Sequence, residues 1–154
     1  MRKRLGACAA LAGAIALAGC GGSGTLSKSD YEKKLKADTQ ELRTAFGKIQ
    51  GNPSSLDALA KQVDVAQATT KKIADDLDGA KPPKDAAADN DKIVAALRAL
   101  DDPLGKLKKA AASGSATLAA QAAQAINNAP ELRDALEAAQ DLKRKGYDVG
   151  GLGS

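Results

Sequence analysis

Cys20 carries a nucleophilic thiol and follows directly on Leu17, Ala18 and Gly19. The thiol is the group in this stretch that forms covalent bonds most readily. Small residues on its N-terminal side let a protease approach the backbone. These residue types allow covalent modification of the thiol and access of a protease to the backbone beside it, so the segment before Cys20 decides where that chemistry would occur.

The segment before Cys20 has the pattern of a secretion signal. Arg2, Lys3 and Arg4 form a positive start, and residues 5–18 are an apolar run without charge. The run is about 14 residues long, whereas a bilayer-spanning helix needs about 20, so it suits the apolar region of a signal peptide. We therefore expect residues 1–19 to be a signal peptide.

The sequence Leu17-Ala18-Gly19-Cys20 resembles the lipobox of bacterial lipoproteins. The resemblance implies transfer of a diacylglyceryl group to Cys20 and cleavage before it by the lipoprotein signal peptidase, which recognises Leu17, Ala18 and Gly19. Two acyl chains anchor a protein stably where one does not. The expected location is the outer face of the cytoplasmic membrane, in the cell envelope. The alternative is an ordinary secretion signal that contains a cysteine by chance.

Residues 20–28 follow as the lipidated cysteine and a flexible tether. Gly21-Gly22-Ser23-Gly24 has the composition of a flexible linker, and Thr25 to Lys28 extends it. The tether would hold the folded part away from the bilayer.

Catalytic chemistry in the remaining chain has few candidates. The chain has no His, the commonest general acid or base at neutral pH, and Cys8 lies in the expected signal. A Ser–Lys pair is the remaining option, but the serines lie at expected caps or turns, where serine has a structural role. We therefore expect no catalytic residue and no enzymatic activity. The serines considered are Ser27, Ser54, Ser55, Ser113 and Ser115.

Two acidic clusters, Asp75-Asp76 with Asp78 and Asp101-Asp102, carry the oxygen ligands that Ca²⁺ prefers. Their spacing matches no calcium-binding loop, so we favour solvated helix faces and expect neither a metal nor a cofactor. Lys108-Lys109 and residues 143–145 are interpreted in the same way, as surface and helix-end charges. Contact of these basic residues with anionic lipid or cell-wall polymers is the alternative.

The charge balance argues against a nucleic-acid partner. Removal of Arg2, Lys3 and Arg4 lowers the basic count from 23 to 20 against 19 acidic residues, and the net charge from +4 to +1. Aromatic residues are 2% of the chain. Without a basic stripe or an aromatic stacking platform, we expect no binding of nucleic acid.

The composition favours an all-α fold, because alanine, the best helix former, dominates the apolar residues and strand-favouring residues are scarce. We expect residues 29–146 to form one antiparallel up-down bundle of about four helices. Residues 147–154 are expected to be a flexible, glycine-rich tail in which Tyr147 is suited to docking.

Four amphipathic segments repeat apolar residues in steps of three and four. Their expected bounds are Ser29, in a capping box with Glu32, to Gly51; Asn52-Pro53 to Gly79; about Lys84, after Pro82-Pro83, to the turn at 113–115; and from there to Gly146. The inward positions include Leu35, Leu42, Phe46 and Ile49 in the first segment and Leu118, Leu132, Leu136 and Leu142 in the fourth.

Pro103 and Pro130 lie inside the third and fourth segments, where a proline bends or breaks a helix. The apolar stripe continues in register through both positions. We therefore expect a kinked third helix, and a kink or local break near Asn127-Asn128 in the fourth.

The part after the tether resembles small, all-helical, uncharacterised lipoproteins of high-GC Gram-positive bacteria. The resemblance lies in Leu26 to Tyr31, in Pro82-Pro83 and in Gly146-Tyr147. Such proteins often have a His about seven residues after the double proline, where this sequence has Asn90. The resemblance implies a helical fold and no particular activity.

Asp38, Thr70 and Asn90 are the polar residues nearest the apolar stripes. We expect each to be rotated to the edge or satisfied locally; the alternative is a polar spot in an apolar groove. Two functions suit the pattern. The first is a binding module that contacts an envelope protein through an exposed helix face. The second is a carrier of a small apolar molecule or lipid in a cleft between helices, with hinges at Pro103 and Pro130.

Overall fold

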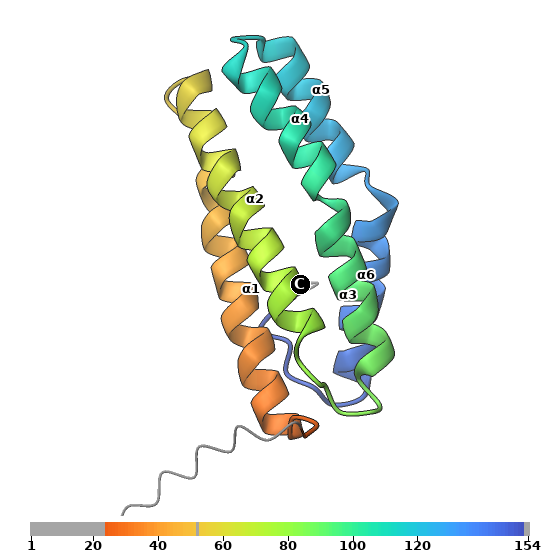
Figure 1. The fold of residues 1–154 in the computed structure, drawn as a ribbon. Coiled ribbons are helices and arrows are strands. Elements are labelled where there is room, and N and C mark those ends of the chain that lie inside the picture. Colours follow the sequence, from red (N-terminus) through yellow and green to blue (C-terminus); the bar gives the residue numbers. More distant parts are fainter. Residues whose placement is uncertain (1–23, 52, 153–154) are drawn as a thin grey trace, which may run out of the picture.

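A computed structural model describes residues 24–51 and 53–152, and this part of the chain is built from helices (Figure 1). The expected signal peptide and Cys20 lie outside the described residues. The helices are α1 (Lys28–Gln50), α2 (Leu56–Asp78), α3 (Ala87–Ala99), α4 (Asp101–Ala112), α5 (Ala116–Asn127) and α6 (Pro130–Arg144).

These helices form the four rods that the apolar stripes predict. α1 and α2 are single rods, α3 and α4 together make the third, and α5 and α6 the fourth. The rods alternate in direction, so the start of α1, the α2–α3 connection and the end of α6 share one end of the bundle (Figure 1). We call this end the tether end. The predicted all-α, up-down bundle is confirmed.

The two bends arise from the prolines. The ring of Pro103 clashes with the carbonyl group four residues earlier in a continuous helix, and α3 ends at that residue, Ala99. Pro130 is the first residue of α6, and Ala129 before it is extended, with φ −62° and ψ 124°. The kink and the break predicted from the sequence are therefore confirmed, the second at Asn128 and Ala129.

Several helix starts differ from the predicted ones. Ser27, not Ser29, caps α1, because its hydroxyl accepts a hydrogen bond from the Asp30 amide at 3.1 Å. Ser55, not Asn52, caps α2 in the same way through the Ala58 amide. α3 begins at Ala87, about three residues later than expected. α1 and α2 thus start where a serine hydroxyl accepts from a first-turn amide, whereas α3 starts after Ala86 without a side-chain cap.

The core consists of two apolar clusters. The cluster at the tether end joins α1, α2, α3, α6 and the C-terminal segment around Tyr31, Ile73 and Leu142. The other joins α2, α4 and α5 around Val63 and Leu104. The bend between α3 and α4 lies where one cluster gives way to the other, so each half of the third rod faces its own core.

The C-terminal segment, residues 147–152, is packed against α1, and the expectation of a flexible tail is wrong for these residues. Tyr147 and Val149 are buried, with Val149 2% exposed. Gly146, at φ +78°, turns the chain out of α6. Gly150 lets it pass α1 closely, because a Cβ there would lie 2.9 Å from the Lys36 Cα. Glycine thus serves a close approach here, not flexibility.

The expected tether is also shorter than predicted at its C-terminal end. Lys28 is the first residue of α1, and the Leu26 amide donates a 2.7 Å hydrogen bond to the Lys81 carbonyl. Leu26 is half-buried against the core. None of the described helices is both long and apolar enough to cross a membrane.

Candidate binding groove

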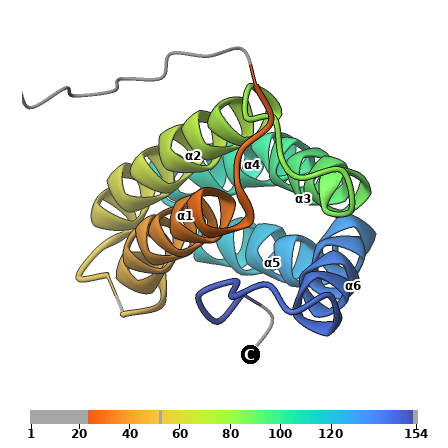
Figure 2. The same cartoon turned by 90° about the horizontal axis from the view of Figure 1, so that it is seen from below.

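The bundle is open between its first and last rods. α1 packs on α2, α2 on α3 and α4, α3 on α6, and α4 on α5. Within residues 24–51 and 53–152, no comparable contact joins α1 to α5 or α6. Figure 2 shows α1 and α6 on either side of the C-terminal segment. A groove of about 400 Å³ lies in this opening.

One wall of the groove is a face of α1. Thr39, Leu42, Arg43, Phe46 and Gln50 line it. Their steps of three and four residues place them on one side of a helix with 3.6 residues per turn. Leu42 and Phe46 were predicted to face inward; each is partly buried against one of the two core clusters and also lines the groove.

The opposite wall comes from the broken fourth rod. Ile126 and Asn127 at the end of α5 and Leu132, Ala135 and Leu136 in α6 line it. Leu132 and Leu136 lie on the stripe predicted to pack inward. Leu136 is instead 46% exposed, and α1 and α6 make no contact comparable to those between the packed helices. The prediction of a core position for Leu136 is therefore wrong, and so is that for Leu118 at 53% exposed.

The floor of the groove belongs to α3 and the residue after it, with Ile93, Ala96, Leu97 and Leu100 all buried. The two bends thus place residues in the groove lining, since Leu100 joins α3 to α4 and Ile126 and Leu132 flank the α5–α6 break. A volume of about 400 Å³ lies within the range of small-molecule sites, and a mostly apolar lining with a few polar groups is typical of them.

The C-terminal segment closes the groove toward the tether end. Gly151 and Leu152 line the groove. The Arg43 Nη2 donates to the Gly151 carbonyl at 2.9 Å, and the Thr39 hydroxyl donates to the Val149 carbonyl at 3.3 Å. The segment therefore lies between the two walls of the opening on the side of the tether end, and side chains of α1 hold it there.

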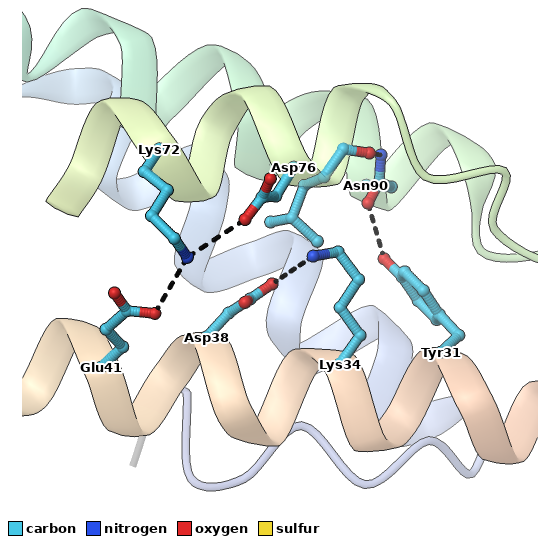
Figure 3. A network of polar contacts seen from close by, with 8 residues as sticks. Tyr31, Lys34, Asp38, Glu41, Lys72, Asp76 and Asn90 are labelled. Carbon is cyan, nitrogen blue, oxygen red and sulfur yellow. Dashed lines mark hydrogen bonds and ion pairs between the residues drawn. The ribbon is translucent and has the colours of Figure 1, made fainter.

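A polar and aromatic cluster fixes the tether end of the same rods. The Tyr31 hydroxyl donates to the Asn90 Oδ1 at 3.0 Å, and the Asn90 Nδ2 donates to the Leu77 carbonyl at 3.1 Å (Figure 3). Tyr31 and Tyr147 meet edge to face at 6.0 Å between ring centroids. Asn90 is thus buried and its side chain links α1, α2 and α3 by hydrogen bonds. The prediction that it lies at the edge or is satisfied by local hydrogen bonds is wrong.

Charged residues add to this cluster. The Tyr147 hydroxyl donates to an Asp85 carboxylate oxygen at 2.8 Å, and the Lys145 ammonium lies 2.6 Å from the buried Asp89 carboxylate. Burial, and then the Asp85 hydrogen bond, raise the pKa of Tyr147 to about 12. Burial raises the pKa of Tyr31 as well. Both phenols are therefore neutral hydrogen-bond donors, and the cluster has a structural role.

Asp38 and Thr70, the other two polar residues on the stripes, are also buried. Thr70 is satisfied locally, as predicted, by donating to the Ala66 carbonyl at 2.8 Å. The Asp38 Oδ2 lies 3.3 Å from the Lys34 ammonium without hydrogen-bond geometry (Figure 3). Burial is the largest influence on Asp38 and raises the pKa of its carboxyl.

The raised pKa of Asp38 predicts a pH-dependent effect of Asp38→Asn. The carboxyl of Asp38 holds its proton more tightly in the folded protein than in the unfolded chain, where its pKa is 3.8. Its contribution to stability therefore falls as the pH rises from 3.8 through the raised pKa of the folded state. The variant should therefore gain free energy of unfolding over the wild type between about pH 4 and about pH 7. Urea unfolding at both pH values measures this, with the exposed Asp134→Asn as control. A difference that stays constant with pH would contradict the burial of a charge at Asp38.

Most of the remaining residues singled out in the sequence have structural partners. Ser27, Ser55 and Ser115 cap helices, and the Ser113 hydroxyl donates to the Ala110 carbonyl. The acidic clusters are neutralised mainly by neighbouring cations: Arg98 pairs with Asp75 and Asp78, Lys72 with Asp76, and Lys106 with Asp102, while Asp101 accepts from Gln67. Lys108, Arg144 and Lys145 pair with Asp64, Asp141 and Asp89.

Sequence reasoning offered a cleft between helices, with hinges at Pro103 and Pro130, as one of two alternatives, but it did not place the groove and it missed Arg43 and Ala135 in the lining. The sequence does contain one relevant pattern, the apolar stripes on the first and last rods. These stripes predict two apolar faces but do not show whether the faces meet. Comparisons with protein-family models, with curated proteins and with solved structures found no match to the chain. The groove is the feature of the described residues most suited to binding.

Proposed function

We propose that this protein is a lipid-anchored binding protein of the cell envelope that holds a small apolar molecule in the groove between α1 and the α5–α6 rod. The groove carries this proposal. Its volume is about 400 Å³ and its lining is largely apolar, whereas a closed bundle would bury these apolar side chains against one another. Burial of an apolar ligand against Phe46, Leu132 and Leu136 would remove that surface from water.

The N-terminal sequence supports the location. A diacylglyceryl group on Cys20 would anchor the chain to the outer face of the cytoplasmic membrane, and the chain enters the bundle at the tether end, beside Leu26 and Lys81. The groove would then lie next to a source of apolar molecules. We propose binding without catalysis, since the chain contains no His and four of the five candidate serines, Ser27, Ser55, Ser113 and Ser115, have structural partners.

Native mass spectrometry of the protein extracted from its own membrane tests this function. The expected mass is that of residues 20–154 with diacylglycerol, plus a smaller non-covalent species. Ala135→Phe should reduce the bound fraction by about fivefold or more, because the larger side chain fills the groove. Ala95→Phe, at an exposed position of α3 outside the groove lining, is the matched control. A wild-type lipoprotein that carries no second species would contradict the carrier proposal.

An envelope protein is the second candidate ligand, and the exposure of Leu136 favours it. An amphipathic helix of a partner could lie along the open side of the groove, as helices do in other apolar grooves. A photo-crosslinking amino acid at position 136 in intact cells tests this candidate. One reproducible polypeptide adduct supports it, and lipid adducts without a polypeptide favour the carrier.

A further inference from the structure

The polar groups at the closed end of the groove are already engaged by the protein itself. The Thr39 hydroxyl donates to the Val149 carbonyl at 3.3 Å, and the Arg43 Nη2 donates to the Gly151 carbonyl at 2.9 Å. Arg43 also has a further interaction. Leu152 lines the groove beside these groups. The closed end is therefore suited to the apolar part of a ligand and not to its head group.

The opposite end of the groove carries two amide side chains. Gln50 is the last residue of α1 and Asn127 the last of α5, and both line the groove. Because α1 runs away from the tether end and α6 runs toward it, these two amides lie at the end of the groove away from the C-terminal segment (Figure 1). Both side chains are exposed, and neither has a hydrogen-bond partner within residues 24–51 and 53–152.

The amide end favours an uncharged head group. Among the described lining residues the charged one is Arg43, which lies about two helical turns before Gln50. An ionised head group at the amide end would lose hydration without meeting an opposite charge. A hydroxyl or ester group could exchange its hydrogen bonds to water for bonds to the amides, which offer both N–H donors and carbonyl acceptors.

The length of the groove limits the hydrocarbon part. The lining residues of α1 extend from Thr39 to Gln50, which spans about 16 Å along a helix. An extended chain advances about 1.2 Å per single bond, since a polypeptide residue of three backbone bonds spans at most about 3.6 Å. The groove therefore holds a hydrocarbon chain of about 13 bonds, along the apolar side chains of Phe46, Leu100 and Leu132.

We infer that the groove binds an uncharged amphiphile, with its hydroxyl- or ester-bearing head at Gln50 and Asn127 and its hydrocarbon tail directed toward the C-terminal segment. This inference rests on the proposed carrier function and names its ligand class and orientation. The two amides select the head group, whereas the apolar walls bind the tail. Gly151 and Leu152 form the end against which the tail stops.

The orientation is tested with the full lipidated protein in vesicles of phosphatidylcholine. Two tetradecanol probes carry a photo-reactive diazirine, one at the end of the chain and the other next to the hydroxyl. Mass spectrometry locates the labelled residues. The first probe should label the C-terminal segment and α1 near Thr39, and the second should label the ends of α1 and α5. At each end the expected probe should exceed the other by about fivefold or more.

The head-group choice is tested with the same method. Replacing both Gln50 and Asn127 by alanine should lower labelling of the groove by about fivefold, because two hydrogen bonds to the head are lost. Gln124→Ala, at an exposed position of α5 outside the groove lining, is the matched control and should leave labelling unchanged. The corresponding myristate probe, in its ionised form, should label the groove at least about threefold less than the alcohol.

The outcomes separate this inference from the function it rests on. Exchanged or identical labelling patterns for the two alcohols would overturn the orientation and leave the carrier function standing. Equal labelling by alcohol and ionised acid would overturn the choice of an uncharged head, and unchanged labelling of the double variant would overturn the role of the amides. Absence of label in the groove from every probe would overturn both the inference and the carrier function. Circular dichroism establishes that each variant is folded before its labelling is compared.

Discussion

Replacing Cys20 by serine is expected to release nearly all of the protein from the membrane fraction. The variant loses the thiol that we propose accepts the diacylglyceryl group, and each buried methylene of the lost acyl chains would remove about 0.8 kcal/mol of membrane binding. None of the described helices offers a second way to span the bilayer. Fractionation of cells with intact-mass analysis of each fraction measures the effect.

The other cysteine provides the control for this experiment. Cys8 lies in the expected signal, so Cys8→Ser should leave both the membrane attachment and the mass of the mature protein unchanged. Retention through a high-salt wash of a Cys20→Ser protein whose intact mass lacks residues 1–19 would show that the anchor is not the lipid on Cys20.

Replacing Tyr31 by alanine is expected to lower the free energy of unfolding by about 3–5 kcal/mol, the usual cost of removing a large buried aromatic side chain. Tyr31 is fully buried in the tether-end core, packs edge to face on Tyr147 and donates to Asn90. Its loss would leave a cavity where α1, α3 and the C-terminal segment meet. Urea unfolding followed by circular dichroism measures the change.

Tyr31→Phe separates the hydrogen bond from the packing. The variant keeps the ring on Tyr147 but leaves the buried Asn90 Oδ1 without its donor, so a loss of about 1–3 kcal/mol is expected. If Tyr31→Ala costs no more than Tyr31→Phe, the aromatic packing at the tether end contributes little and the cluster is held by its polar bonds alone.

The helix breaks could be predicted from the sequence because their cause is local. A proline restricts its own φ, lacks an amide proton and clashes with the preceding turn whatever surrounds it. Pro103 and Pro130 therefore bend the third and fourth rods where the sequence indicates. The starts of α1 and α2 could not be predicted as well, since Ser27 and Ser29 are equally able to cap a helix. The Leu26–Lys81 hydrogen bond, which involves a distant segment, fixes the chain before Ser27.

The groove could be predicted only in part. Periodicity shows that Leu42 and Phe46 share a face and that Leu132 and Leu136 share another, but it does not show whether the two faces touch. In the structure the C-terminal segment lies between them at the tether end. Glycine content argued for a mobile tail, whereas Val149 is buried through contacts with residues more than a hundred positions away. Such contacts leave no local pattern.

The packed C-terminal segment has a practical consequence for anyone who labels this protein. A fluorescent protein or purification tag fused to the C-terminus would sit beside Gly151 and Leu152 at the closed end of the groove and would crowd whatever binds there. The turn at residues 113–115 lies at the opposite end of the bundle (Figure 1), and around Gly114 there is open space. An epitope inserted in that turn would report on the protein in cells while leaving the ligand-binding end untouched.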